Sequence, residues 1–559
     1  MMKRNMPIGI DDFKKLREDY YLVDKTDFIR QLIDGHSAVT LITRPRRFGK
    51  TLTMSMLDYF FSIEKKDETE HLFDGLAIDR AGTEYLARRG GSPTIFLTLR
   101  GLKQPTFAEL LQNFSNTMGE LYRSHAEAVS NAALDPADLD YFERVKNYKA
   151  DKVDLELSLL KLCKFLQQAY GRPIILLLDE YDVPIQNSWE CGYYDEGIAF
   201  MKNFLGNALK GNPYLDFAIL TGVLRVGKES IFSDLNNLEV CSVLSDTYSD
   251  VFGFTYAEVE KMAHDLGHPE QLPVIKDWYD GYRFGESEIY NPWSVIYFFR
   301  KNNKPSAYWM NTSSNGILQD MLEEAGADRL QEMRTLLEGG TVWTQVDERI
   351  VYSDLRYSDS ALYTLLLTTG YLTAVSEAQD DDDGYSTYEL RIPNREIRSV
   401  FSSEIMKHIA TGLDINEFVI LRRSLFHGHI AEFEKRLQKI LLRIVSTYDT
   451  ANRESFYHGF MLGLVAMLAI GRRYEVKSNR ESGYGRFDLA LVPRDTANPG
   501  VVMEFKVAET PEDMETRAQE ALAQIEEKAY TTELKESGVE NIWCYGIAFC
   551  GKHVYIARD

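Results

Sequence analysis

Short apolar runs alternate with amphipathic helical patterns over the first 240 residues of the chain. Residues 174–178 are five consecutive branched aliphatic residues, as in a parallel strand that helices cover on both faces. The alternation predicts an α/β layered domain, which we assign to residues 1–245. Its predicted strands are 37–43, 95–99, 174–178 and 217–220, and its predicted helices are 51–61, 105–126 and 152–170.

The pattern changes at two points further along the chain. Residues 246–426 are less periodic and rich in aromatic residues, which predicts a mainly helical middle region with a solvated loop at 380–384. From residue 427 on, the order of helical and strand-like patterns predicts a separate α/β/α domain at 427–559. Its predicted helices are 429–447, 454–470 and 511–531, and its predicted strands are 473–478, 487–492, 501–507, 541–549 and 553–557.

The composition is ordinary for a globular protein, because the 559 residues are 44% apolar and 26% charged. The five cysteines are scattered without a CxxC pair, which argues against a zinc site or a disulfide framework. The start of the chain lacks the apolar segment of a signal peptide, and the longest uncharged apolar run, 460–470, is too short to span a bilayer. We therefore expect a cytoplasmic protein without a membrane partner.

The net charge of −22 argues against a general affinity for nucleic acid or anionic membrane. The charge is uneven, because residues 431–559 hold 17 Lys and Arg against 20 Asp and Glu, which leaves −19 for the rest of the chain. Contact with nucleic acid is therefore expected at the C-terminal domain alone, and it should weaken with salt. A basic cluster precedes the acidic strands of this domain: Arg472, Arg473, Lys477 and Arg480.

A candidate phosphate loop lies between the first predicted strand and the helix that follows it. The end of the GxxxxGK(S/T) pattern is present, while Arg44 stands at its first glycine position. In such a loop, backbone N–H groups and the helix N-terminus bind phosphate, the lysine reaches the β- and γ-phosphates, and the threonine holds Mg²⁺. The alternative is a basic turn in which the Gly-Lys-Thr triplet occurs by chance and binds no phosphate. The predicted nucleotide-binding residues are Arg46, Arg47, Phe48, Gly49, Lys50 and Thr51.

Acidic residues that would complete this site follow the strand 174–178 directly. Asp179 would bind Mg²⁺ through water, and Glu180 would orient and deprotonate the attacking water. Thr221, at the end of the next strand, could sense the γ-phosphate, and Arg225 could contact nucleotide or a neighbouring domain. The alternative is an acidic turn at the end of the strand, with Thr221 in a capping role.

These motifs resemble the AAA-ATPase-like family of bacteria and archaea. The resemblance implies an N-terminal P-loop NTPase fold, with a parallel sheet and helices on both faces, and ATP and Mg²⁺ as cofactors. It also implies that an arginine at the first glycine position is normal for the family, and it implies no particular cellular process. The segments that carry it are 21–26, 44–51, 178–182, 221–223, 230–232, 278–282 and 290–294.

A second acidic site is predicted in the C-terminal domain. Asp488 lies in the run 487–492, and Glu504 and Lys506 lie two positions apart in the strand 501–507, so these two share one face. Charged residues on an otherwise apolar strand cost stability unless they are paired or used. Two carboxylates from adjacent strands can hold Mg²⁺, and a lysine beside them can position water and stabilise charge on a phosphate.

This spacing is similar to the PD-(D/E)XK nuclease superfamily, with Phe487 in place of the usual proline. The resemblance implies a restriction-endonuclease-like fold. His458 could face the same site, although a helix-packing role is favoured, and the turn before Asp488 could present Arg486 to phosphate. The alternative is a salt-bridge network in a nuclease-like fold that has lost activity. The implied catalytic residues are Asp488, Glu504, Lys506, Glu454 and Gln524.

The sequence therefore predicts an Mg²⁺-dependent ATPase joined through a helical region to an Mg²⁺-dependent nuclease-like domain. The ATP state would control access to nucleic acid, DNA being favoured, in DNA repair, mobile elements or defence. A homo-oligomer is compatible with the sequence. One rival is a signalling or scaffold NTPase whose C-terminal domain binds nucleic acid without cutting it, and another is a binding module with an inert P-loop.

Overall fold

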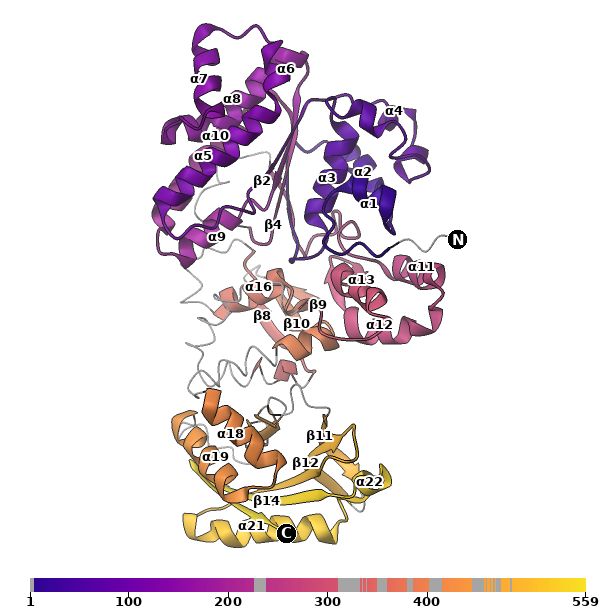
Figure 1. Ribbon diagram of the computed structural model, residues 1–559, viewed down its shortest axis with the longest axis vertical. Helices are drawn as coiled ribbons and strands as arrows, with labels where there is room; N and C mark the ends of the chain where they lie inside the picture. The colour runs from indigo at the N-terminus through magenta and orange to yellow at the C-terminus, as the bar shows by residue number, and fades with distance from the viewer. Residues whose placement is uncertain are drawn as a thin grey trace. The chain divides into compact units, whose positions relative to one another are not determined.

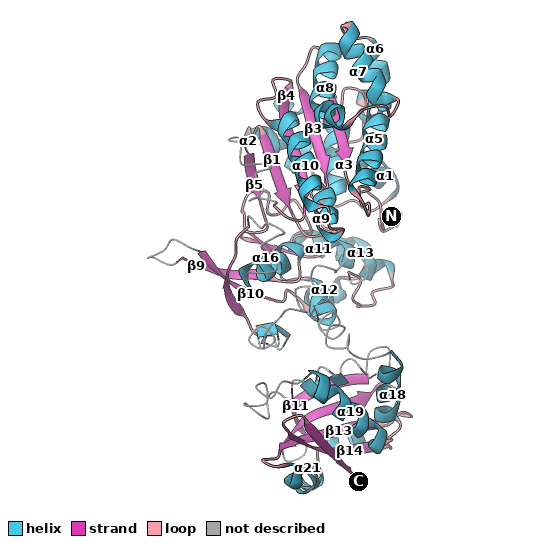
Figure 2. Cartoon of the chain, turned by 90° about the vertical axis from the view of Figure 1, so that its left-hand side faces the viewer, coloured by secondary structure: helices cyan, strands magenta, loops and turns pink. Residues whose placement is uncertain are grey.

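The computed structural model divides the chain into two compact units. Unit 1 comprises Met1–Glu324 and Thr335–Val400, and unit 2 comprises Ala325–Arg334 and Phe401–Asp559. The ribbon is drawn in Figure 1 and the secondary structure in Figure 2. The structure describes residues 5–225, 238–309, 332–333, 335–337, 339–348, 359–379, 386–401, 415–444, 457–458, 460–462, 464–465, 468, 474–482 and 485–559.

A five-stranded parallel sheet forms the centre of the N-terminal part of unit 1. Its order is β2-β3-β4-β1-β5, so β4 lies between β1 and β3. The carboxyl ends of these three strands meet at one edge, since Ile42 pairs with Thr221 and Leu178 pairs with Leu220. The strands are β1 (Val39–Thr43), β2 (Thr94–Thr98), β3 (Ile174–Asp179), β4 (Leu215–Gly222) and β5 (Leu238–Cys241).

Helices cover both faces of this sheet, and every residue of β1 and β3 is buried. Figure 1 shows α5, α8 and α10 on one face and α1, α2 and α3 on the other. Asp151 caps the N-terminus of α8, where its carboxylate accepts from the N–H of Asp154, and Gly171 caps the C-terminus in a left-handed conformation. The helices are α1 (Phe13–Asp19), α2 (Asp27–Gly35), α3 (Lys50–Phe61), α4 (Thr83–Leu86), α5 (Phe107–Ser124), α6 (Ala126–Ser130), α7 (Pro136–Lys146), α8 (Lys152–Tyr170), α9 (Val183–Glu190) and α10 (Tyr194–Leu209).

The middle region is mainly helical, and its residues up to Glu324 and from Thr335 to Val400 belong to unit 1. It also contains the hairpin β6-β7 and the antiparallel sheet β8-β10-β9, which the sequence patterns did not predict. Its helices are α11 (Tyr256–Leu266), α12 (Leu272–Tyr279), α13 (Pro292–Arg300) and α16 (Asp359–Thr369). Its strands are β6 (Tyr282–Phe284), β7 (Ser287–Ile289), β8 (Val342–Gln345), β9 (Thr373–Gln379) and β10 (Ser386–Arg391).

Unit 2 is built on a mixed five-stranded sheet of order β11-β12-β13-β14-β15, in which only β13 and β14 run parallel. The two faces of the sheet carry separate cores, because alternate residues of each strand point to opposite faces. Figure 1 shows α18 and α19 on one face and α21 on the other. The elements are α18 (Ile415–Phe426), α19 (Ile430–Ile444), β11 (Tyr474–Ser482), β12 (Gly485–Pro493), β13 (Gly500–Val507), α21 (Met514–Glu527), α22 (Thr532–Glu536), β14 (Ile542–Cys550) and β15 (His553–Arg558).

The predicted fold class is confirmed: a parallel α/β sheet, a helical middle and a C-terminal α/β/α part. Within the described ranges, no helix is both long and apolar enough to cross a membrane. The predicted loop at 380–384, residue Glu454, and Arg472 and Arg473 of the basic cluster lie outside the residues that the structure describes.

Candidate active sites

The loop between β1 and α3 has the backbone of a phosphate-binding loop. Gly49 is the N-cap of α3 and has a φ of 87°, a left-handed conformation that favours glycine. Lys50 is buried, and its Nζ donates to the carbonyl oxygens of Arg44 and Pro45 at 2.7 and 2.8 Å. Burial lowers the pKa of Lys50 to about 8, although nearby carboxylates oppose this shift.

Asp179 links this loop to the two neighbouring strands. Its side chain is fully buried at the end of β3, where Oδ2 accepts from Thr51 Oγ1 at 2.7 Å. Its second oxygen, Oδ1, accepts from Thr221 Oγ1 at 2.6 Å. Because β4 lies between β1 and β3, Thr221 stands between the loop and the acidic strand, where the sequence predicted it. One carboxylate therefore orients both hydroxyl groups.

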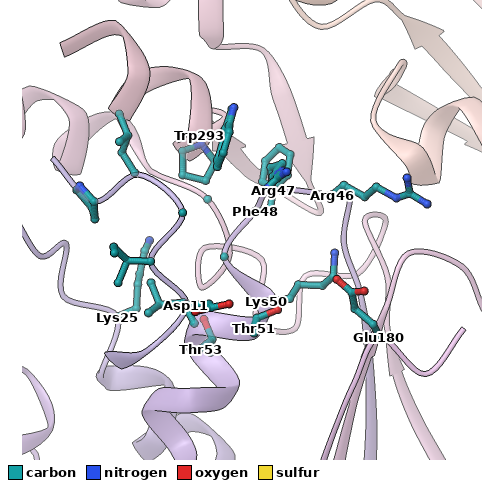
Figure 3. Close-up of a pocket in the computed structure, with 18 of the residues that line it drawn as sticks. Asp11, Lys25, Arg46, Arg47, Phe48, Lys50, Thr51, Thr53, Glu180 and Trp293 are labelled. Carbon is teal, nitrogen blue, oxygen red and sulfur yellow. The ribbon is translucent and has the colours of Figure 1, made fainter. Parts of the chain in front are cut away.

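Glu180 follows Asp179 with a φ of 54°, an uncommon and strained conformation for a non-glycine residue. Its side chain lines the same cavity as Lys50, and Figure 3 shows the two side chains next to each other. Burial raises the pKa of Glu180, and the charge of Asp179 raises it further. A carboxylate with a raised pKa is suited to accept a proton from water.

The turn after Thr221 is held by the segment that follows β3. Asp182 Oδ2 accepts from the N–H groups of Val223 and Leu224 at 2.7 and 2.9 Å. Tyr181 donates its hydroxyl to the carbonyl oxygen of Leu224 at 2.7 Å. Gly222 is needed here because an added Cβ would lie 2.7 Å from the Tyr181 ring. Asp182 is thus a structural residue of this turn.

A cavity of about 370 Å³ opens beside the loop and has two chemically different ends. The polar end is lined by Lys50, Thr51 and Glu180, with Arg46, Arg100 and Lys103 around it. The other end is mostly apolar, and the segment before α1 contributes to it. Pockets of this size commonly hold small molecules or cofactors. The apolar end includes Met6, Ile10, Val23, Phe254, Met262 and Ile296.

Arg44, at the first glycine position of the pattern, is fully buried and is not among the residues that line this cavity. Its Nη1 donates to the carbonyl oxygens of Thr43, Cys241 and Ser242 at 2.6–2.9 Å, and Nη2 donates to that of Tyr248 at 3.1 Å. Burial lowers the pKa of Arg44 to about 10. The side chain thereby ties the loop to the segment after β5.

The other basic residues of the prediction lie in different places. Arg46 lines the cavity and donates to Gln186 Oε1 at 3.2 Å. The Arg47 guanidinium lies over the Trp293 ring, 4.1 Å from its centroid, and Figure 3 shows both residues at the cavity. Phe48 is buried against Tyr282 and Phe284. Arg225, like Asp179 and Thr221, is not among the residues that line the cavity, and its predicted contact with nucleotide or a neighbouring domain stays a prediction.

The second acidic site lies where β12 and β13 stop pairing. The last paired residues are Leu489 and Met503, so Asp488 and Glu504 stand directly beyond them. Asp488 Oδ2 accepts from the N–H of Phe505 at 2.7 Å, which takes the place of the next bond between the strands. Glu504 is 4% exposed. The two carboxylates are therefore brought together at one end of a strand pair.

Lysine and amide groups surround Glu504. Lys506 Nζ lies 4.0 Å from Glu504 Oε1, as expected for residues that share one strand face. Gln524, on α21, donates through Nε2 to Glu504 Oε1 at 2.5 Å and to the Tyr530 hydroxyl at 3.2 Å. Burial raises the pKa of Tyr530, and the charges of both carboxylates raise it further. Tyr530 is thus a member of this site that the sequence analysis missed.

His458 packs beneath the site and does not enter it. Its Nε2 lies 3.0 Å from the backbone oxygen of Asp488 and 3.2 Å from Ser478 Oγ, and its ring contacts Phe505. The favoured helix-packing role agrees with this position. The hairpin before Asp488 is present, because β11 and β12 pair as far as Ser482 and Gly485.

Lys477 of the predicted basic cluster is bound to another side chain. Its Nζ donates to Glu533 Oε1 at 2.5 Å, so much of its charge is neutralised within the protein. Glu454 lies outside the described residues, so the structure says nothing of its position. Among the residues that are described, no group of three or more His, Cys, Asp or Glu is arranged to hold a metal ion.

Among the cavity residues that sequence reasoning missed are Trp293, Arg100 and Lys103. Trp293 lies in a segment that carried the family resemblance, which was the available signal. Arg100 and Lys103 follow the predicted strand at 95–99, and strand ends of a parallel sheet collect at the ligand edge. That topological rule would have indicated these two residues.

Comparisons with known families agree with both resemblances. Residues 7–232 match the model of a family described as predicted AAA-ATPase. Residues 452–559 match the model of the PD-(D/E)XK nuclease superfamily. The family resemblances inferred from the motifs are thereby confirmed for the two ends of the chain.

A relative of the whole chain comes from Azotobacter chroococcum mcd 1. It is described as an uncharacterized protein in the vnfD 5' region. The two sequences are 26% identical over 570 residues, which cover 98% of this chain and 97% of the relative. The similarity therefore spans the P-loop part, the middle region and the nuclease-like part together.

Proposed function

We propose that this protein hydrolyses ATP and acts on nucleic acid. The proposal is supported by the match of one part of the chain to a predicted AAA-ATPase family and of another part to the PD-(D/E)XK nuclease superfamily. ATP is bound and hydrolysed in unit 1, and the acidic site of unit 2 cleaves a phosphodiester bond. The nucleotide state controls access of nucleic acid, DNA being favoured, to the second site. The observation that carries the ATPase part is the Asp179 carboxylate, which bonds both Thr51 and Thr221.

The cavity beside the loop supports this assignment through its two ends. The triphosphate fits the polar end, where Lys50 and the N-terminus of α3 supply positive charge. The nucleoside fits the apolar end, beside Trp293 and Phe254. Lys50 Nζ donates to two carbonyl oxygens of the loop. When ATP binds, Nζ would donate to phosphate oxygens instead.

Hydrolysis requires a water molecule aligned with the γ-phosphate and a group that takes its proton. Glu180 is the candidate base, because its side chain lines the cavity next to Lys50 and its pKa is raised by burial. Thr221 is suited to sense the γ-phosphate, since its hydroxyl donates to Asp179 and the turn after it donates a backbone N–H to Asp182.

The donor groups of both sites fit Mg²⁺, which prefers oxygen ligands. In unit 1 these are the Thr51 hydroxyl and the Asp179 carboxylate, and in unit 2 they are the carboxylates of Asp488 and Glu504. Bound Mg²⁺ would neutralise phosphate charge and polarise the phosphorus–oxygen bonds. Lys506, 4.0 Å from Glu504, supplies a further cation for charge that develops on the phosphate. Gln524 holds the Glu504 carboxylate in place.

The test is a paired assay on the full chain with Mg²⁺. ATP turnover is measured for wild type and Lys50→Ala, and cleavage of a mixed DNA and RNA panel is measured for wild type, Glu504→Ala and Lys506→Ala. We expect the first substitution to abolish turnover and the other two to abolish cleavage. Equal turnover with Lys50→Ala would mean that the P-loop is inert. Binding of nucleic acid without cleavage by wild type would instead favour a signalling or scaffold NTPase.

A further inference from the structure

Two consecutive residues of the phosphate loop are held by tryptophans of the middle region. The carbonyl oxygen of Arg46 accepts from the indole Nε1 of Trp309 at 3.4 Å. The Arg47 guanidinium lies 4.1 Å over the ring of Trp293. Both arginines line the cavity, so the two tryptophans determine where this side of the loop stands relative to a ligand.

Glu396 lies behind both tryptophans and is fully buried. Its Oε1 accepts from the backbone N–H of Trp309 at 2.8 Å and from Ser294 Oγ at 2.9 Å. Ser294 follows Trp293 in the first turn of α13, which Asn291 caps. One carboxyl oxygen therefore joins the two segments that carry the tryptophans.

The second oxygen of Glu396 has an unusual environment. Oε2 is buried, and no hydrogen-bond partner for it is found among the described residues. The titratable side chains that face Glu396 are Tyr279, Tyr282 and Tyr308, whose own pKa values are raised, above all by burial. Burial raises the pKa of Glu396 to about 7. A buried carboxyl oxygen without a hydrogen-bond partner is costly to keep in a fold, so a use for this carboxyl group is expected.

We propose that Glu396 is a positioning residue of the phosphate loop, which it holds through Trp309 on Arg46 and through Ser294 and Trp293 on Arg47. The inference rests on the proposed binding of ATP in unit 1. Glu396 does not line the cavity and acts through the two tryptophans. Without it, ATP would have to order this side of the loop on binding, which weakens the apparent affinity.

Calorimetric titration of the full chain with Mg-ATP tests the proposal. Trp309→Phe keeps an aromatic side chain and removes the indole N–H that donates to Arg46. Glu396→Ala removes the carboxyl oxygen that accepts from Ser294 and from the Trp309 N–H. Each should weaken ATP binding by about fivefold or more, the equivalent of one hydrogen bond. Glu396→Gln keeps an acceptor oxygen and should bind like wild type at pH 6. The matched controls Trp343→Phe and Glu288→Gln change exposed residues and should have no effect.

The pH dependence separates a positioning role from a general loss of stability. Between pH 6 and 8, wild type should lose severalfold in affinity relative to Glu396→Gln, because only wild type acquires a buried charge there. Lys50 is present in both proteins, so its titration cancels in this ratio. If Glu396→Ala fails to fold, Trp309→Phe and Glu396→Gln still decide the question.

Two results would overturn the proposal, and they differ from each other. Binding of ATP by Trp309→Phe and Glu396→Ala within twofold of wild type, with no pH dependence of the ratio, rejects the role of Glu396 alone. Failure of the folded wild-type chain to bind ATP at any pH rejects the proposed function and this inference with it.

Discussion

The two candidate sites stand at strand ends that are organised in opposite ways. In unit 1, parallel strands end at one edge of the sheet, and Thr51 and Thr221 each donate to one oxygen of the Asp179 carboxylate. In unit 2, two antiparallel strands stop pairing, and each carboxylate has its own support. Asp488 is held by a backbone N–H, and Glu504 is held by Gln524 from a helix.

This difference predicts how far the loss of one side chain should disturb the other residues of the same site. The side chains of the first site depend on one another, so the loss of one hydroxyl disturbs a shared carboxylate. The acidic residues of the second site depend on the backbone and on one amide, so the loss of one residue should leave the other in place. Networks of buried polar groups are strongly coupled in this sense.

The largest expected effect is a separation of the two activities. Glu180→Gln should lower ATP turnover by roughly 10²–10⁴-fold, the usual cost of losing a general base, while ATP binding remains. Glu504→Gln should abolish cleavage and leave ATP turnover intact. Steady-state turnover and a nuclease assay on the same preparations measure both. Loss of ATP turnover with Glu504→Gln would show that the two sites do not work separately.

Two glycines beside the sites should differ in their tolerance of a side chain. In Gly546→Ala the new Cβ would lie 2.1 Å from the Ala518 backbone oxygen of α21, whereas in Gly222→Ala it would meet the Tyr181 and Asp182 side chains. Backbone yields less than side chains, so we expect a destabilisation of about 3 kcal/mol for the first and about 1–2 kcal/mol for the second.

Hydrogen exchange measured on individual peptides shows in which unit each substitution lowers the stability. Gly206→Ala is the control, because its Cβ would meet nothing within 4 Å and alanine favours the helix in which it lies. A larger destabilisation from Gly222→Ala than from Gly546→Ala would contradict the packing described for the two sheets.

Thr221→Val tests the shared carboxylate of the first site. The substitution keeps the shape of the side chain and removes the donor to Asp179 Oδ1. ATP turnover should fall by about tenfold or more, as expected for a lost hydrogen bond to a charged group. Thr221→Ser should recover most of it. Unchanged turnover in the valine variant would mean that Asp179 and Thr51 suffice.

The smallest expected effect is a pH dependence of ATP binding. Because burial lowers the pKa of Lys50 to about 8, this side chain is charged below that pH and neutral above it. Affinity should therefore decrease between pH 7 and 9, by at most about tenfold. Lys50→Arg keeps its charge, so its profile should be flat above pH 8, where Glu396, with a pKa of about 7, is already ionised in both proteins. A parallel decrease in both proteins would assign the titration to another group.

The sequence predicted the strand ends well because the chemistry of both sites follows local patterns. The run at 174–178 indicated the buried strand that carries Asp179, and the spacing of Glu504 and Lys506 indicated their shared face. Side-chain direction was not predictable in the same way. Arg44 occupies a loop position but turns into the protein, because the carbonyl groups that receive it lie almost 200 residues away in the chain.

Contacts between distant segments account for the rest. Nothing local marks Glu396 as buried, since its donors Trp309 and Ser294 come from other segments. Lys477 belongs to a basic stretch in the sequence, yet it is bound to Glu533 of α22. The short strand β8 pairs with β10 across 42 to 48 residues of sequence, which periodicity in a single run does not reveal.

The central claim is that ATP in unit 1 controls cleavage at Asp488, Glu504 and Lys506 in unit 2. It is tested most directly by the rate of nucleic-acid cleavage with and without ATP, in Mg²⁺, for wild type, Glu180→Gln and Glu504→Ala. We predict cleavage by wild type that changes with ATP, an ATP response in Glu180→Gln that persists because ATP is not consumed, and no cleavage by Glu504→Ala. Cleavage that survives Glu504→Ala, or that is the same with and without ATP, would contradict the account.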